Sequence, residues 1–263
     1  MSDTAITTSA AKPGSPGRKT TATGWILHNV VWIWLIALVV IFGMFNEYFF
    51  TIFNLQNIMV QATVLGIMAL AMALPLLVAE IDLSIPANVG FSAAIGALCN
   101  TDLGMPFGIA ALIGIAAATF IGFFNAVCIT KLKMVSLIQT LSMMIILQGA
   151  LLALTQGRTI TSLSSGYVWI GQETIGGWPV MPVVFLLAIV GMAILLRNTV
   201  LGRSIYAVGG NAVASNSAGI RVDRVKILAY SISGFLAGVA GYLLASWQMA
   251  ITSNQGASYL LYA

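Results

Sequence analysis

The chain has 263 residues, of which 59% are hydrophobic and only 7% are charged, and its mean hydropathy is +0.99. A soluble globular domain has about 25% charged residues, so this composition excludes a soluble enzyme and a soluble binding protein. The formal net charge of +4 belongs to basic residues that stand between apolar runs, and we attribute it to membrane topology. We therefore expect an all-α polytopic membrane protein that binds no nucleic acid.

The N-terminal residues 1–24 are rich in Ser, Thr, Ala, Gly and Pro, and they are expected to form a disordered cytoplasmic tail. A single transmembrane domain then occupies residues 25–263. Its first apolar run, residues 25–45, is longer than the apolar core of a signal peptide, which predicts an uncleaved first span with the N-terminus inside. A second span is predicted at about Ile58–Ala79, bent or ended near Pro75 because proline removes a backbone donor.

The segment AEIDLSIP separates the second span from a run of about 14 apolar residues, Ile85–Leu98. That run is short for a third crossing, since an untilted helix needs roughly 20 residues. Two interpretations of Glu80 and Asp82 stay open. Their carboxylates lie in irregular backbone at membrane depth, where charged residues are usually functional, or they lie at the interface, where Asp82 or Ser84 caps the next helix.

Four further spans complete the prediction, at about residues 105–129, 134–154, 178–196 and 227–247. Residues 155–177 are predicted to be a loop. Gly234, Gly238 and Gly241 in the last span are spaced to let helices approach closely. With the N-terminus inside, every basic residue except Arg158 is cytoplasmic, and this bias supports about seven crossings.

Two polar residues inside the predicted spans, Asn125 and Gln139, are candidates to line a pathway, although hydrogen bonding between helices is the more frequent role of such residues. The sequence contains no phosphate-binding loop, no zinc-type spacing of His and Cys, and no nucleophile with a recognisable base. We therefore expect no catalytic residue, no metal site and no cofactor in this chain.

The longest polar interval between apolar runs, Gly202–Lys226, is predicted to be a cytoplasmic loop that contains a short surface helix. Gly209 and Gly210 permit a tight turn, Asn211 suits the N-cap, and Gly219 suits the left-handed residue that ends a helix. Such a helix either docks in a groove of another protein or is an interfacial linker whose basic residues meet anionic lipid. The residues alone leave both interpretations open.

Three segments resemble the membrane permeases of bacterial ABC importers for ribose, xylose and related monosaccharides. They are IDLS at residues 81–84, LIQTLS at 137–142, and LGRSIYAVGGN at 201–211, which is followed by AGI at 218–220. The similarity runs in the same order from about Trp25 to the end of the chain. It implies a multi-pass protein of the bacterial inner membrane, driven by a separate cytoplasmic ATPase that binds the ATP. It also implies a periplasmic sugar-binding protein and a second permease copy as partners.

The resemblance also assigns roles to residues. The polar interval would carry the helix that couples the ATPase to the permease, with Gly202, Arg203, Tyr206, Gly209, Gly210, Asn211, Ala214, Gly219 and Ile220 as the coupling residues. The translocation pathway would include Glu80, Asp82, Ser84, Asn125 and Gln139.

The chain departs from the family pattern at Ala79, Glu80 and Pro86, where family members usually have glycine. Family members also continue with further transmembrane helices beyond the point where this chain ends, so the resemblance implies that the C-terminal helices are missing. Two alternatives remain. One is an ion-coupled secondary transporter that uses Glu80 or Asp82 as its proton carrier, and the other is a fragment that inserts but does not transport.

Overall fold

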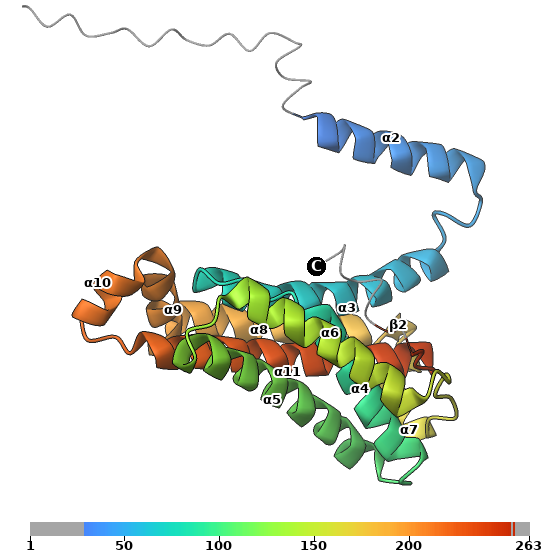
Figure 1. The fold of residues 1–263 in the computed structure, drawn as a ribbon. Coiled ribbons are helices and arrows are strands. Elements are labelled where there is room, and N and C mark those ends of the chain that lie inside the picture. Colours follow the sequence, from blue (N-terminus) through green and yellow to red (C-terminus); the bar gives the residue numbers. More distant parts are fainter. Residues whose placement is uncertain (1–28, 254, 256–263) are drawn as a thin grey trace, which may run out of the picture. The chain divides into compact units, whose positions relative to one another are not determined.

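The computed structural model describes residues 29–253 and residue 255 (Figure 1). The chain divides into two compact units, residues 1–54 and residues 55–263. The first unit contains helix α2 (Val30–Phe45), which is the described part of the predicted first span. The tail predicted for residues 1–24 lies outside the described residues.

Helices dominate the second unit. Helix α3 (Ile52–Leu77) enters it from the first unit. It is followed by α4 (Ile85–Thr101), α5 (Phe107–Lys131), α6 (Ser136–Thr155), α7 (Ser165–Gln172), α8 (Met181–Asn198), α9 (Val200–Gly210), α10 (Ala212–Ser217) and α11 (Val222–Gln248). Between α7 and α8, the strands β1 (Thr174–Ile175) and β2 (Trp178–Pro179) form a small antiparallel hairpin.

The all-α polytopic class is confirmed. Within the described residues, α3, α5, α6, α8 and α11 are long and apolar enough to cross a membrane, and α2 is a shorter apolar helix. The third predicted span, which is short for a crossing, forms α4. This helix has 17 residues and is buried along most of its length. These seven helices correspond to the seven predicted crossings, while the side on which the N-terminus lies stays a prediction.

Several boundaries differ from the prediction. The last span begins at Val222 rather than Ile227, because charged residues make up much of its first two turns and the apolar pattern begins only after them. Residues 155–177 are not only a loop, since they contain α7. This short helix is held by Tyr167, which is 1% exposed and packs edge-on against Tyr242 of α11 with ring centroids 5.1 Å apart.

Small residues bring α4, α5 and α11 into close contact. A Cβ atom added to Gly234 would lie 2.5 Å from the carbonyl oxygen of Ala118, and one added to Gly238 would lie 2.7 Å from the Cα of Ile115. The same addition at Gly241 would lie 2.6 Å from the carbonyl oxygen of Val89. The predicted close approach is therefore confirmed: α11 packs backbone to backbone against α5 and α4, as small residues allow in membranes.

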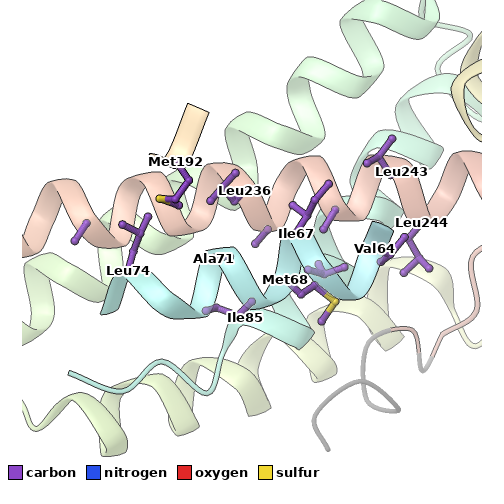
Figure 2. Packing of buried hydrophobic residues seen from close by; sticks show 14 of the residues in the cluster. Val64, Ile67, Met68, Ala71, Leu74, Ile85, Met192, Leu236, Leu243 and Leu244 are labelled. Carbon is purple, nitrogen blue, oxygen red and sulfur yellow. The ribbon is translucent and has the colours of Figure 1, made fainter. Parts of the chain in front are cut away.

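Larger side chains join α3 and α8 to α11. Ile67, Met68 and Leu74 of α3 are fully buried in a cluster that also contains Met192 of α8 and Leu243 of α11, as Figure 2 shows. The outward faces of α5, α6 and α8 carry exposed large apolar side chains, as expected of helices that meet lipid. The second unit thus has a tightly packed interior around α11, and the polar features described below lie at the end where α3 ends and α11 begins.

The close packing predicts a difference between two Gly→Ala substitutions. Gly234→Ala should lower the free energy of unfolding by about 1 to 3 kcal/mol, because the added methyl group overpacks the contact with α5. Gly149→Ala is the matched control, since a Cβ there meets nothing within 4 Å and a helical alanine is favoured over glycine. Thermal unfolding in detergent measures both variants. Equal melting temperatures would contradict the close packing of α5 and α11.

Candidate polar site and coupling segment

The site begins where α3 ends. The Glu80 N–H donates to the Pro75 carbonyl oxygen and the Ala79 N–H donates to that of Leu76, both at 3.0 Å. Ala79 has φ +59°, so this helix end has the hydrogen-bond pattern in which the residue after the cap is left-handed and is usually glycine. The expected helix end near Pro75 is confirmed. Ala79, one of the departures from the family pattern, occupies the left-handed position.

The start of α4 lies well inside the bundle. The Asn125 Nδ2 atom of α5 donates to the Ser84 Oγ atom at 2.9 Å. Asn125 lies six residues before the end of α5 at Lys131, which is about 9 Å along the helix axis. Residues 78–84 therefore enter the bundle as irregular backbone. This placement favours the first of the two interpretations for Asp82, which precedes Ser84 by two residues. Ser84 does occupy the N-cap position of α4, but its side chain makes no capping hydrogen bond.

Four of the five predicted pathway residues form one buried chain of hydrogen bonds. Asp82 Oδ1 accepts from the Ser84 N–H at 2.9 Å and from the Ser84 hydroxyl at 2.6 Å. Beyond the contact between Asn125 and Ser84, Gln139 Nε2 of α6 donates to Asn125 Oδ1 at 3.2 Å. None of the four residues is more than 6% exposed. The chain links the connection before α4 to both α5 and α6.

Three further side chains hold the backbone of the irregular segment. Thr140 Oγ1 accepts from the Leu83 N–H at 3.2 Å, and Ser136 Oγ accepts from the Ile81 N–H at 3.4 Å. The Tyr230 hydroxyl of α11 donates to the Ile81 carbonyl oxygen at 3.3 Å. The sequence did not single out these three residues, although Thr140 belongs to the LIQTLS segment that carried part of the resemblance.

The fifth predicted pathway residue, Glu80, lies beside this chain rather than in it. Its carboxylate forms an ion pair with Lys226 of α11, and the two side chains are 15% and 19% exposed. The pair connects the end of α3 to the beginning of α11. Lys226 was expected in a loop, but it belongs to the second turn of a helix.

The electrostatics of the segment set Asp82 apart. Its carboxyl is buried inside the bundle, and two hydrogen bonds from Ser84 meet its Oδ1 atom. The charged or titratable groups nearby are those of Glu80, Lys226 and Tyr230. Within residues 29–253 and 255, no group of His, Cys, Asp and Glu side chains is arranged to hold a metal ion.

The predicted coupling loop is mostly helical. Helix α9 begins after Thr199, whose Oγ1 accepts from the Gly202 N–H at 3.1 Å. Its buried residues Ile205 and Val208 face the core, whereas Arg203 and Tyr206 are exposed. The predicted turn at Gly209 and Gly210 is wrong, because both residues lie inside α9. Gly209 instead permits a close approach: a Cβ there would collide with the carbonyl group of Leu77 at the end of α3.

The predicted surface helix is present as α10. The Asn211 side chain caps it by accepting from the Ala214 N–H at 2.9 Å, and Gly219, with φ +85°, follows its end. Gly210, Asn211, Ala214 and Gly219 are exposed, whereas Gly202 is buried and Ile220 packs against the core. The nine predicted coupling residues thus form one continuous segment at the end of the bundle opposite α7 (Figure 1).

Comparisons with known proteins identify a matching family and several similar proteins. A protein family described as the permease component of branched-chain amino acid transport systems matches residues 54–263. The chain is 33% identical to the ribose import permease RbsC of Haemophilus influenzae, covering 90% of this chain and 74% of that protein. It is 34% identical to RbsC of Bacillus subtilis (86% and 71%) and 31% identical to the autoinducer 2 import system permease LsrC of Photorhabdus laumondii (86% and 68%). No solved structure matches the chain.

The left-handed Ala79 predicts a stabilising substitution. Ala79→Gly should raise the free energy of unfolding by roughly 0.5 to 1 kcal/mol, because glycine adopts φ > 0 without the steric penalty of a Cβ atom. Ala62→Gly, on an exposed position inside α3, should lower it by a similar amount. Thermal unfolding of both variants is the measurement. A fall in the melting temperature of Ala79→Gly would exclude the proposed helix end.

Proposed function

This chain belongs to the family of transport-system permease components, and from that premise we propose that it is the membrane subunit of an ATP-driven importer for a monosaccharide. With five helices long and apolar enough to cross a membrane in its described part, it is a multi-pass protein of the inner membrane. A separate cytoplasmic ATPase supplies the energy, a periplasmic binding protein delivers the sugar, and a second copy of the chain completes the permease.

One observation carries the proposal: an exposed surface helix is connected to a buried polar segment through direct contacts. Helix α10 presents Ala214 and the cap residue Asn211 to solvent. The preceding helix α9 rests on the end of α3 through Gly209 and Leu77, and the irregular segment that contains Asp82 begins directly after Leu77. A displacement of α9 and α10 by a docked ATPase would therefore reach this segment directly.

The ion pair between Glu80 and Lys226 provides a second connection, since Lys226 follows α10 on the next helix. ATP can drive transport only if the inward and outward states of the permease bind their partners with different affinities. The segment around Asp82 suits such a two-state element, because its backbone is held by side-chain hydrogen bonds from α6 and α11 instead of by a regular helix.

The substrate class rests on the polar groups of this segment and on the relatives. Carboxylate, hydroxyl and amide groups of Asp82, Ser84, Asn125 and Gln139 are donors and acceptors of the kind that bind sugar hydroxyls. The RbsC relatives are named for ribose import. We therefore place ribose or a similar monosaccharide first among the candidate substrates.

The function is tested by uptake of radiolabelled ribose into cells that produce the chain together with a partner ATPase and a periplasmic sugar-binding protein. We expect accumulation that requires all three proteins and that stops when the ATPase carries an inactivated phosphate-binding loop. Accumulation without the ATPase, driven by a proton gradient, would instead support a secondary transporter.

Exchanging charges between Glu80 and Lys226 tests the connection to the polar segment in the same assay. Lys226→Glu should reduce uptake at least tenfold, because it leaves two buried carboxylates facing each other. Adding Glu80→Lys restores the pair in the opposite order and should recover a substantial part of the activity. Membrane insertion of both variants is checked by quantitative immunoblotting. An inactive single variant that the second exchange does not rescue would contradict a role for the pair itself.

A further inference from the structure

A basic groove lies beside α10, between the end of α5 and the beginning of α11. It has a volume of about 610 Å³, and its lining includes Lys131, Lys133, Arg221, Arg224, Asp223 and Val213. Four of these side chains are cationic and one is anionic, so the charged groups of the lining sum to +3. A groove with this balance attracts an anion.

The two arginines are available to a ligand. The single carboxylate of the groove, Asp223, pairs with the two lysines, at 2.8 Å from Lys131 and 3.9 Å from Lys133. Neither Arg221 nor Arg224 has an acidic partner among the residues that the structure describes, and both are exposed. A guanidinium group binds phosphate through two parallel hydrogen bonds, so two unpaired arginines in one groove match a phosphate group.

The position of the groove points to a lipid as the source of that phosphate. Lys131 is the last residue of α5, and Arg224 lies in the first turn of α11. Both helices are long and apolar enough to cross a membrane, so their ends lie at the level of the lipid headgroups. Basic pockets between the ends of transmembrane helices are suited to anionic headgroups.

The apolar part of the lining supports the same source. Val213 of α10 is 78% exposed and lines the groove next to the arginines. A phospholipid presents apolar glycerol and acyl carbons beside its phosphate, and these carbons can pack against Val213. A free phosphate or an acidic peptide offers less apolar surface for that contact. We propose that this groove binds the phosphate headgroup of an anionic phospholipid, with Arg221 and Arg224 as its ligands.

The test measures binding of phosphatidylglycerol and phosphatidylcholine to the purified chain in neutral detergent by native mass spectrometry. We expect preferential binding of phosphatidylglycerol. The double variant Arg221→Gln, Arg224→Gln should weaken that binding about tenfold or more, since each basic residue near the membrane surface contributes to headgroup attraction. The matched control is Arg197→Gln, Arg203→Gln, which removes two arginines from the ends of α8 and α9 that do not line the groove. It should change binding less than twofold.

Competition identifies the source of the anion. Millimolar inorganic phosphate and a hexaglutamate peptide are added in separate arms, and neither should displace phosphatidylglycerol. Displacement by inorganic phosphate would reassign the groove to a soluble phosphate compound, and displacement by the peptide would reassign it to an acidic segment of a partner protein. Equal binding of the two lipids, or equal losses in the two double variants, would also overturn the proposal. Melting temperatures of both double variants confirm that each remains folded.

Discussion

The hydrogen bond from Asn125 to Ser84 fixes the depth at which α4 begins, and much of the structure depends on it. A backbone that is not helical can lie inside a membrane protein only if other groups satisfy its N–H and C=O groups, since no water is available there. In this chain Ser136 and Thr140 of α6 and Tyr230 of α11 bind backbone groups of the segment, while Asn125 of α5 holds the side chain of Ser84. The irregular segment is therefore stable only when all three helices are packed around it.

This requirement explains the small residues of the bundle. Gly234 and Gly238 allow α11 to lie close to α5, and α11 also brings the Tyr230 hydroxyl to the Ile81 carbonyl oxygen of the segment. It also explains the short α4. With 17 residues this helix is about 26 Å long, against about 38 Å for α5 with its 25 residues. The connections at the two ends of α4 make up the difference, and one of them is the polar segment.

Much of this could be predicted from the sequence. The apolar runs located the crossing helices because a membrane-spanning helix needs about 20 such residues, and Asn211 and Gly219 marked the ends of α10 because their roles depend on local geometry alone. Helix α9 was missed because Gly209 and Gly210 have the composition of a turn, and only the position of Leu77 in space shows that Gly209 serves close packing. The depth of Asp82 was undecided for the same reason: it depends on Asn125, 43 residues further along the chain.

The first two turns of α11 form an inner ion pair on one face and line the basic groove on the opposite face. Arg224 and Lys226 are two residues apart, which places them about 200° apart around the helix, so Lys226 meets Glu80 while Arg224 lines the outer groove.

The ion pairs on the two faces contribute differently to stability. The Lys131 and Asp223 side chains are 58% and 38% exposed, and such a surface pair contributes at most about 1 kcal/mol. Removing one partner of the mostly buried pair between Glu80 and Lys226 leaves an uncompensated charge and destabilises by about 3 to 5 kcal/mol. The inner face of α11 is therefore fixed to the end of α3. An anion bound in the groove and a partner docked on α10 would both meet the first turns of α11, which the ion pair of Lys226 with Glu80 connects to the buried segment.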